Sequence, residues 1–490
     1  MKPGVVVSLD ENGYVFTGAG TTISMNVTKV HTDNFNNVEV VTWNTNVVFA
    51  GSKGKIIAYE ISYDDIKIDE AEITLPMVNG QDRKVEGMFK MGDKTLLIVG
   101  GGEILPIEIN IIEQSATHYK IEHQIGKAKK FTEYGYKAFP HCDDLTNPWV
   151  YRTYACTWEE DEKLITGIFR VENEGVNAQI NLLSQAEYGS KRRFHGLAGL
   201  GPTGYVVAAV GALPNDTEHT AGPILLRYVN INENNKLSFG NWTYLPFEWT
   251  SGFFSIDNLH RRGAVICFTR EASQGIDCTG IDVKDDLSLV FGSTLRLNKG
   301  GAAIDVSRTK MMIINNSTFA LLYADQNVGG SVIYQMMTFT NAGDLVRNGP
   351  AYVISHRAGL INHIIGCARW DNYKSAIVEI IDNGMEKLAL LHTVYVYPRP
   401  IGIAGKNMAG KNQIQFGGLW RIPDKSMKLI PGVMYYTNDR GMILRGFPAG
   451  YAHRSFGIMY IRSRDDGSLL NLHNQIGMAV SENEILIRWH

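Results

Sequence analysis

Two short segments of the sequence collect side chains that could do chemistry. His141, Cys142, Asp143 and Asp144 are consecutive, and all four are residue types that bind metal ions. Residues 158–163, WEEDEK, hold four acids in six positions, and a glycosidase needs two carboxyl groups facing each other across a cleft. One run of ligands is no metal site without further ligands elsewhere, and a charged hairpin tip explains the acidic run better. Neither segment predicts a catalytic residue or a bound metal.

The motifs of several common enzyme classes are missing from the sequence. It contains no GxSxG nucleophile turn, no GxxxxGK[ST] phosphate-binding loop, no HExxH zinc motif and no alternating-acid calcium loop. We therefore predict no catalytic residue and no cofactor.

The composition is that of a folded, nearly neutral protein. Hydrophobic residues make up 44% of the 490 positions, charged residues make up 20%, and 47 Lys and Arg stand against 50 Asp and Glu. This balance gives no long-range field to hold a nucleic acid or an anionic membrane, so we expect neither as a partner. The first residues, MKPGVVVSLDENG, lack the apolar core of a signal peptide, and no run of about eighteen apolar residues would span a membrane.

Five cysteines occur in the chain, namely Cys142, Cys156, Cys267, Cys278 and Cys367. Their number is odd and no two form a CxxC pair, so neither a zinc ribbon nor a disulfide framework is indicated. We expect most of them to be small buried apolar residues.

Apolar residues recur mostly with a period of two or in short bursts rich in Val and Ile. Almost no window has the spacing of an amphipathic helix. Examples of the bursts are NVVFAGS (46–52), KIIAYEIS (55–62), AVICFTRE (264–271) and SAIVEII (375–381), each bounded by turn-forming residues. The sequence therefore predicts an all-β protein.

The predicted strands recur in units. Residues 38–76 contain four strands joined by short turns, and a similar pattern then restarts six more times. The seven units start at residues 38, 85, 137, 192, 252, 301 and 360. Their spacing suits one antiparallel four-stranded blade per unit.

An isolated four-stranded sheet exposes both faces and both edges, whereas stacking such sheets around an axis buries both faces. We therefore predict a β-propeller over residues 1–398, with seven blades. Six or eight blades fit the same pattern, because the units carry no WD or kelch signature. The last unit lacks an outer strand, while VVVSL (5–9) and YVFTGAG (14–20) belong to no unit. We expect this N-terminal segment to supply the missing strand and close the ring.

The pattern changes at Pro398 and Pro400, which we expect to end the strand ladder. Residues 399–490 then form a second, smaller unit, predicted to be a β-barrel or sandwich. The stretches IGIA (401–404) and IGMA (476–479) repeat one pattern. We expect them on two strands of one core, where each glycine lets a neighbouring backbone approach closely.

This C-terminal unit resembles a β module found at the ends of phage tail-fibre proteins and of surface proteins of large DNA viruses. The resemblance rests on PIGIA (400–404), GG (417–418), LIPG (429–432), YY (435–436), NDRG (438–441) and IGMAVSENEILI (476–487). It departs from the usual module at RSRDDGSLLNLHN (462–474), which is longer here. The resemblance implies a structural module of a virion that often forms oligomers or lies close to the receptor.

The funnel at the centre of the predicted propeller is where we expect ligand-binding residues. Propellers of the sialidase type carry a Ser-x-Asp-x-Gly-x-x-Trp turn, which this sequence lacks. Aromatic rings with polar handles commonly grip sugars or protein surfaces in such funnels. From the innermost strands we select Trp43, His195, His363 and Trp370 as ligand-binding candidates. The alternative for Trp43 and Trp370 is packing between blades.

A second aromatic group lies in NWTYLPFEWT (241–250). The alternation of Trp242 and Tyr244 suggests one face of an outer strand. Together with Trp249, these residues are candidates for contact with a partner protein, and the alternative is again packing in the core.

These patterns predict a non-enzymatic virion component, part of a tail, fibre or capsid surface, that acts in host attachment or particle assembly. The expected partners are other virion proteins, further copies of the chain, and a host-surface glycan or protein. We expect assembly in the host cytoplasm and a final location in the virion. Two alternatives stay open. One is a glycan-binding or glycan-cleaving propeller enzyme, which needs carboxylates converging in the funnel, and the other is a protein-interaction platform.

Overall fold

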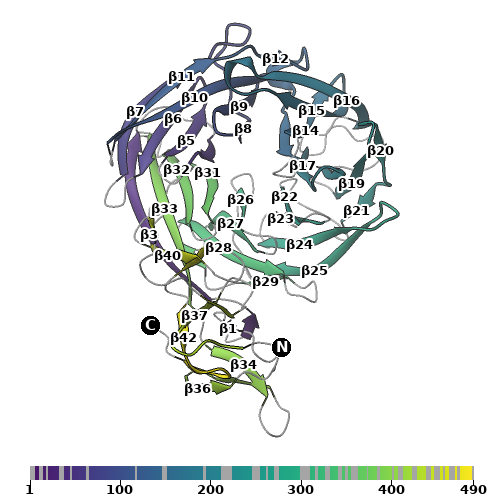
Figure 1. Cartoon of the computed structure of the whole chain (residues 1–490). Coiled ribbons are helices and arrows are strands. Elements are labelled where there is room, and N and C mark those ends of the chain that lie inside the picture. Colours follow the sequence, from purple (N-terminus) through teal and green to yellow (C-terminus); the bar gives the residue numbers. More distant parts are fainter. Residues whose placement is uncertain are drawn as a thin grey trace.

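Strands make up almost all of the regular structure in this computed structural model, as the period-two pattern predicts (Figure 1). The structure describes residues 6–9, 15–17, 20–31, 38–44, 47–61, 66–115, 118–145, 152–190, 195–210, 223–245, 254–260, 263–269, 275–297, 310–314, 318–325, 331–339, 345–347, 351–354, 362–371, 374–382, 387–399, 402–406, 412–415, 417–421, 428–437, 443–445, 453–455, 458–462, 469–471 and 475–487. These residues form two short 3-10 helices, η1 (Gly135–Lys137) and η2 (Gly175–Asn177), and no α-helix. In the described ranges no helix has the length and apolarity needed to cross a membrane.

Seven antiparallel sheets of four or five strands lie around a common axis in the described part of the chain (Figure 1). Blade 1 consists of β4 (Glu39–Thr42), β5 (Val47–Ser52), β6 (Lys55–Ile61) and β7 (Ile66–Thr74). Blade 2 consists of β8 (Gly87–Met91), β9 (Thr95–Gly100), β10 (Glu103–Ser115) and β11 (His118–Ile125), with β12 (Lys129–Lys130) beside β10. Blade 3 consists of β13 (His141–Asp144), β14 (Thr153–Glu160), β15 (Lys163–Glu172) and β16 (Gln179–Ser190).

The next three blades follow the same order from the axis outwards. Blade 4 consists of β17 (His195–Gly199), β18 (Gly204–Val210), β19 (Ile224–Ile231) and β20 (Leu237–Phe239), with β21 (Thr243–Tyr244) beside β19. Blade 5 consists of β22 (Phe254–His260), β23 (Gly263–Thr269), β24 (Ile276–Val283) and β25 (Leu289–Arg296). Blade 6 consists of β26 (Lys310–Ile313), β27 (Thr318–Asp325), β28 (Ser331–Phe339) and β29 (Leu345–Arg347), with β30 (Tyr352–Val353) beside β28.

Blade 7 closes the ring with a strand from the other end of the chain. It consists of β31 (Asn362–Asp371), β32 (Lys374–Asp382), β33 (Lys387–Arg399) and the N-terminal β3 (Gly20–His31). The innermost strand β31 contacts β4 of blade 1, so the described blades form a complete circle of seven. The innermost strands begin within a few residues of the predicted unit starts, except in blade 6, where residues 301–309 lie outside the described ranges.

Closure by the N-terminal segment is confirmed, but the strand that closes the ring is a different one from those predicted. The segments VVVSL and YVFTGAG contribute β1 (Val6–Leu9) and β2 (Val15–Thr17), which pair with each other. β1 also pairs with β34 (Gly402–Lys406) of the C-terminal unit. The 12 residues of β3 can follow the 13-residue β33 along almost its whole length, which the shorter strands cannot do.

Both faces of each sheet are buried against neighbouring blades. β5 is buried at all six positions, because a second strand of a blade has another blade on either side. Between blades 2 and 3, the fully buried ring of Trp158 packs against Phe131, with ring centroids 5.1 Å apart. Similar apolar clusters fill the other interfaces, and their burial is the main driving force for this fold.

The prediction that the prolines end the strand ladder is wrong for Pro398. β33 continues through Pro398 to Arg399, and these residues pair with Thr21 and Gly20 of β3. β32 accompanies β33 only as far as Tyr395, so the last residues of β33 have a strand on one side alone. Proline is tolerated at such an edge because its missing N–H is not needed for a second ladder.

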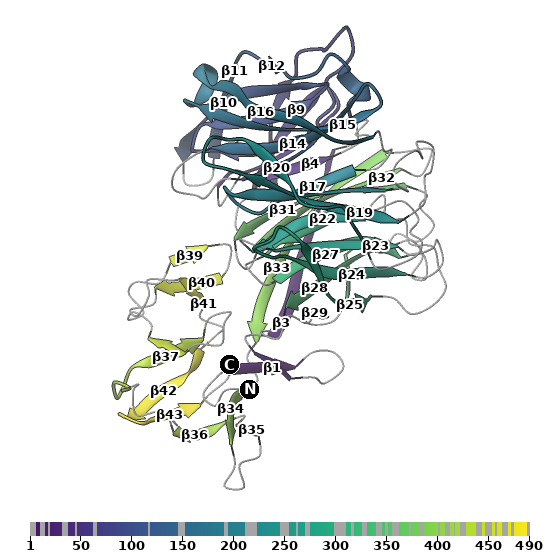
Figure 2. The same cartoon turned by 90° about the vertical axis from the view of Figure 1, so that its right-hand side faces the viewer.

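The C-terminal unit contains three sheets within the described residues (Figure 2). The first joins β2, β1, β34 and β35 (Asn412–Gln415). The second has the order β36 (Gly418–Arg421), β43 (Glu484–Ile487), β42 (Gln475–Ser481), β37 (Met434–Thr437) and β38 (Ile443–Arg445). The third consists of β39 (His453–Ser455), β40 (Ile458–Arg462) and β41 (Leu469–Asn471). The barrel or sandwich, and the division at residue 399, stay predictions.

The repeated IGIA and IGMA stretches supply strands to two different sheets, β34 and β42, but their side chains share one core. Ile403 and Ile476 are fully buried in the same apolar cluster. A side chain at Gly477 would place its Cβ 2.0 Å from the carbonyl oxygen of Leu486 on β43. Glycine is therefore required there by close backbone approach, as the sequence predicts.

The interpretation that no disulfides form is also wrong. Cys142 is bonded to Cys156, and Cys267 to Cys278, while Cys367 is free. Each pair occupies directly opposed positions on neighbouring antiparallel strands. The cysteines of a pair are 14 or 11 residues apart, and only the strand register brings them together. Spacing alone therefore could not indicate these bonds.

Candidate functional site

Polar side chains from five blades meet on the propeller axis. The innermost strands line this axis, each beside the innermost strand of the next blade. Six of their side chains interact with one another across blades, and we call them the axial cluster: Glu39, His141, Asp143, Asp257, Lys310 and Cys367. All six are exposed or partly exposed, whereas the surfaces between the blades are apolar.

Lys310 and Glu39 form an ion pair that bridges two blades which are not neighbours. Lys310 begins β26 of blade 6 and Glu39 begins β4 of blade 1, with blade 7 between them. The Lys310 Nζ donates to Glu39 Oε1 over 2.8 Å. The Glu39 carboxylate raises the pKa of Lys310, so the lysine stays charged at neutral pH. The pair thus connects blades 6 and 1 across the innermost strand of blade 7.

Asp143 and Asp257 place two carboxyl groups close enough to affect each other. Asp143 lies on β13 of blade 3 and Asp257 on β22 of blade 5, so blade 4 stands between them. The Asp143 carboxyl accepts hydrogen bonds from the backbone N–H of Gly199 at 2.7 Å and of Asp144 at 2.8 Å. Asp257 accepts one from the backbone N–H of Asn258 at 2.7 Å. Strand ends of two neighbouring blades therefore position the first carboxyl.

Loss of contact with water favours the protonated form of both acids. Removal of water raises the pKa of Asp143 to about 7, although its two backbone hydrogen bonds oppose the shift. The pKa of Asp257 is raised well above its usual range, first by burial and then by the Asp143 charge. At neutral pH the pair therefore holds at least one proton, which makes it the strongest candidate for acid–base chemistry in the described chain.

His141 and His195 pack edge to face beside these acids, with ring centroids 5.1 Å apart. His141 is open to solvent, but surrounding protein and then Lys310 lower its pKa to about 4. His195 is only 5% exposed, and its Nε2 lies 3.9 Å from Glu159 Oε1, too far for a hydrogen bond. Burial and then His141 hold the pKa of His195 well below its usual range, so both rings are neutral at pH 7.

Cys367 completes the cluster on β31 of blade 7. Burial raises the pKa of its thiol to about 12, and Lys310 opposes the shift only partly. The thiol is therefore protonated at neutral pH and is a poor nucleophile.

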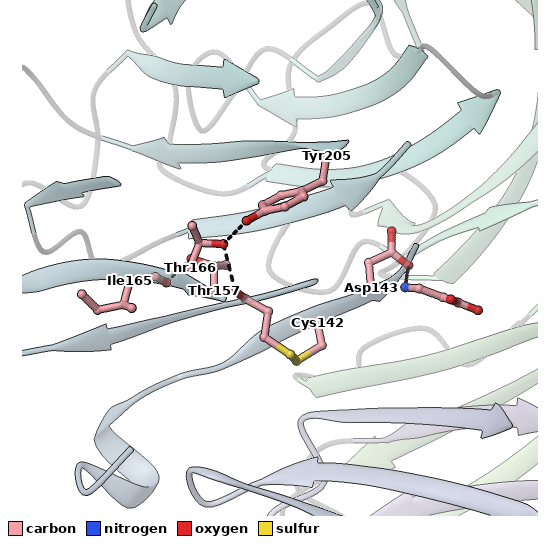
Figure 3. The surroundings of a disulfide bond; sticks show 8 residues. Cys142, Asp143, Thr157, Ile165, Thr166 and Tyr205 are labelled. Carbon is pink, nitrogen blue, oxygen red and sulfur yellow. Dashed lines mark hydrogen bonds between the residues drawn. A yellow bond between two sulfur atoms is a disulfide. The ribbon is translucent and has the colours of Figure 1, made fainter. Parts of the chain in front are cut away.

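The disulfide of blade 3 fixes one side of the axial cluster. Cys142 precedes Asp143 on β13, and successive side chains of a strand point to opposite faces (Figure 3). The Cys142–Cys156 bond therefore ties β13 to β14 on one face while Asp143 points to the other. His141, Cys142 and Asp143 thus lie together on a strand, but Cys142 is not available as a metal ligand. No group of three metal-binding side chains occurs among the described residues.

Two of the four predicted ligand-binding residues lie in the interior instead of on a binding surface. Trp43 is 5% exposed and packs edge to face on Phe49 in the core between blades 1 and 2. This corresponds to the packing alternative, because the ring offers almost no surface to a ligand. His195, on β17 of blade 4, is buried beside Glu159 on β14 of blade 3. His363 and Trp370 lie on β31, but their side chains are outside the described part of the structure.

The two described aromatic residues of this group in blade 4, Trp242 and Tyr244, differ in burial. Trp242 is half-buried against Tyr188, with ring centroids 6.0 Å apart, and Arg227 lies over its ring. Tyr244 is 47% exposed on the short outer strand β21, in the kind of position that the sequence predicts. Trp249 is outside the described residues. Contact of these residues with a partner stays a prediction.

The ligand-binding residues predicted from the sequence were chosen for their aromatic rings, and they therefore do not include the axial acids or Lys310. A usable signal exists, because each innermost strand is expected to be apolar on the faces that meet its neighbours. Glu39, Asp257 and Lys310 interrupt such strands with an ionisable side chain. Polar residues at the start or centre of the first strand in each unit would have identified the axis.

Comparisons with known proteins bear on the fold alone. No protein-family model matches the chain, and no curated protein matches it in sequence. The WD40 domain of SCAP from fission yeast is 8% identical, with a TM-score of 0.36, and the match covers 75% of this chain and 98% of that one. Saccharomyces cerevisiae Sqt1 is 12% identical, with a TM-score of 0.41, and the match covers 78% of this chain and 100% of that one. At this level of similarity, function has to be argued from the residues themselves.

Proposed function

We propose that this chain is a non-enzymatic structural component of a virion, in a tail, fibre or capsid-surface assembly, that acts in host attachment or particle assembly. The observation that carries the proposal is the double connection between propeller and C-terminal unit. β3 and β33 run side by side out of the propeller, and β1 then pairs with β34 (Figure 2). Two hydrogen-bonded strands hold a recognition domain in a more constant orientation than a single flexible linker does.

The two disulfides support a location outside a reducing compartment. Such bonds persist in secreted proteins and on virion or cell surfaces, and they are rare in the cytosol. A protein that assembles in the host cytoplasm and is then exposed on a released particle would form them late. The Lys310–Glu39 pair also supports a structural axis, because each charge is neutralised by the other.

In this proposal the C-terminal unit contacts other virion proteins, and the propeller presents its surface to a host glycan or protein. Tyr244 is one exposed aromatic side chain that suits this contact. An antibody against the chain should label purified particles of the virus that encodes it. The chain should also bind host-type glycans or host cells without consuming a substrate. Its presence in infected cells but never in purified particles would contradict the proposal.

The convergence of Asp143 and Asp257 favours a second candidate function, glycan cleavage on the axis. A glycosidase needs one protonated carboxyl group and one ionised carboxylate on either side of the bond that breaks. The pKa of Asp143, about 7, allows it to ionise while Asp257 keeps its proton. Asp257 would then be the acid and Asp143 the base or nucleophile.

Turnover measurements on the full chain separate the two candidates. The chain is incubated with a panel of host-type polysaccharides, and release of reducing ends is measured. The first proposal predicts binding without turnover. Turnover that is lost in both Asp143→Asn and Asp257→Asn, but kept in the exposed control Glu172→Gln, would replace the first proposal by the second.

A further inference from the structure

The two disulfides of the propeller differ in their access to solvent. Cys142 is partly exposed on β13, the innermost strand of blade 3, while its partner Cys156 is fully buried. In blade 5, both Cys267 and Cys278 are fully buried. Thiol–disulfide exchange requires an attacking sulfur to reach a sulfur of the bond. The blade 3 bond therefore offers an external thiol a point of attack in the folded chain, and the blade 5 bond does not.

A cavity beside the blade 3 disulfide gives its two sulfurs room to separate. The cavity has a volume of about 10 Å³, and its lining includes Cys142, Cys156, Phe89, Tyr154 and Val171. Two thiol sulfurs stay farther apart than the two bonded sulfurs of a disulfide, and a close-packed core resists such a movement. The blade 3 bond can therefore open with little displacement of its neighbours. The blade 5 cysteines lie instead within the apolar cluster shared by blades 5 and 6.

The blade 3 disulfide also lies between two members of the axial cluster. Cys142 stands between His141 and Asp143 on β13, and this short strand pairs with β14 at four positions (Figure 3). Asp143 accepts a hydrogen bond from the backbone N–H of Gly199 in blade 4 at 2.7 Å. The bond to Cys156 thus fixes β13 from one face, and the hydrogen bond from Gly199 holds it from the other. Opening or closing the disulfide therefore changes the restraint on the axial carboxyl.

We propose that Cys142–Cys156 is a redox-responsive bond that opens in a reducing compartment, closes in an oxidising one, and fixes β13 with Asp143 at the axis when it is closed. The inference rests on the virion role proposed above and adds its regulation. A chain assembled in the host cytoplasm would hold the open form, because thiols there keep such bonds reduced. Exposure on a released particle would then close the bond. The buried blade 5 bond responds more slowly, because blade 5 must open first.

An external low-mass disulfide, R–S–S–R, is the oxidant for closure. The Cys142 thiolate attacks one of its sulfurs, so that a Cys142–S–R bond forms and R–S⁻ leaves with the proton that Cys142 has lost. The Cys156 thiolate then attacks the Cys142 sulfur, which forms the Cys142–Cys156 bond and expels the second R–S⁻ with the proton from Cys156. Two protein thiols are oxidised, and one external disulfide is reduced to two thiols. Opening is the reverse sequence and starts with attack on the partly exposed Cys142.

Differential alkylation of the full chain measures which bond exchanges. The Cys367→Ala variant removes the free thiol, so that every labelled cysteine comes from a disulfide. The chain is incubated with reduced glutathione, free thiols are blocked with iodoacetamide at set times, and the remaining cysteines are reduced and labelled with N-ethylmaleimide. We expect Cys142 and Cys156 to be blocked at least about tenfold faster than Cys267 and Cys278.

Oxidised glutathione should then restore the blade 3 bond, while circular dichroism in the same buffers shows that the chain stays folded. Equal exchange rates at the two disulfides would overturn the proposal. So would blade 3 thiols that appear only when the chain unfolds, or that fail to close again in the folded chain.

A titration of Asp143 tests whether the bond fixes the axial carboxyl. The chain carries isotope-labelled aspartate, and the Asp143 carboxyl signal in the NMR spectrum is assigned with Asp143→Asn. In the double variant Cys142→Ala, Cys156→Ala, we expect the titration midpoint to fall by about one pH unit, because a looser strand lets water reach the carboxyl. The matched control Cys267→Ala, Cys278→Ala should leave the midpoint unchanged. If the first variant does not fold, the wild type opened with glutathione replaces it. An Asp143 midpoint that does not change would contradict the proposal.

The ionisable neighbours Asp144, Asp257 and His141 are present in every chain compared, so a shift reports the restraint on β13. Antibody labelling of particles decides the proposed function separately. A chain that is absent from purified particles, but whose disulfide exchanges as expected, would refute the virion role alone. A chain that is present on particles, but whose blade 3 disulfide does not exchange, would refute the redox inference alone.

Discussion

The propeller and the C-terminal unit bury their sheets in different ways. Each blade has a neighbour on both sides, and the N-terminal β3 completes the last blade, so the ring covers its own apolar faces. The five-stranded C-terminal sheet has a core on one side, but it leaves Leu419 and Met478 exposed on the other. A ring covers its apolar faces within one chain, whereas a small open sheet keeps part of one face exposed to solvent. The comparison thus assigns most of the buried apolar surface, and with it most of the stability, to the ring.

Removal of the closing strand should have the largest effect on the ring. A chain that lacks residues 1–31 loses β3, which pairs with β33 at eleven positions, and it exposes the edge of blade 7. We expect loss of cooperative thermal unfolding, measured by circular dichroism. A chain that lacks only residues 1–17 keeps β3 and should unfold like the intact protein. Equal melting of the two truncated chains would mean that β3 does not close the ring.

Truncation of one buried ring between blades should have the next largest effect. Trp158→Ala removes a fully buried side chain from the interface of blades 2 and 3 and should cost about 3–5 kcal/mol in the free energy of unfolding. Leu419→Ala, on the exposed sheet face, should cost less than about 0.5 kcal/mol. Urea unfolding of both variants measures the difference. Similar losses would remove the distinction between the two regions.

Loss of the blade 5 disulfide should destabilise the propeller less than loss of the Trp158 ring. Cys267 and Cys278 close a short loop between β23 and β24, and loops of this length contribute about 2–3 kcal/mol by restricting the unfolded chain. The double variant Cys267→Ala, Cys278→Ala should show this loss in urea unfolding. Adding a reductant to the wild type should also lower its stability. Cys367→Ala, which breaks no disulfide, is the control, and an equal loss there would exclude the loop-closure explanation.

The smallest effect expected in the propeller is a pH dependence from its axis. In the unfolded chain Asp143 ionises near pH 4, but in the folded chain it keeps its proton until about pH 7. Stability therefore falls as the pH rises through this window, because the folded state binds more protons than the unfolded state. Between pH 5 and 8 the free energy of unfolding of the wild type should fall by about 1–2 kcal/mol more than that of Asp143→Asn, after a discount for the partial exposure of Asp143. Unfolding midpoints of wild type and variant that stay parallel over this range would show that Asp143 does not titrate as proposed.

Much of the fold follows from the sequence because its signals are local and repeated. The recurrence of NVVFAGS-like bursts and turns predicts the blades, and the missing outer strand of the last unit predicts closure by the N-terminal segment. The exact closing strand was not predicted, because the length match between β3 and β33 appears only once both are paired. Pro398 was misjudged for a related reason, since a proline is harmless where a strand has one neighbour.

The candidate site could be predicted much less well, because it depends on contacts between distant residues. Trp43 was selected for its residue type, yet the fold places it between blades. Asp143 and Asp257 come from alternate blades, and Lys310 reaches Glu39 over a third. Only the circular arrangement brings these residues together, so the sequence marks them as ionisable residues on innermost strands but not as neighbours of one another. The two disulfides were hidden in the same way by strand register.

A comparison of the full chain with residues 18–399 tests the independence of the ring most directly. The shorter chain keeps all seven blades and β3, but it lacks β1, β2 and the five-stranded C-terminal sheet. Thermal unfolding of both chains is measured by circular dichroism. We predict that the shorter chain unfolds cooperatively, near the melting temperature of the propeller in the full chain. A shorter chain that is unfolded, or that melts without cooperativity, would contradict this account.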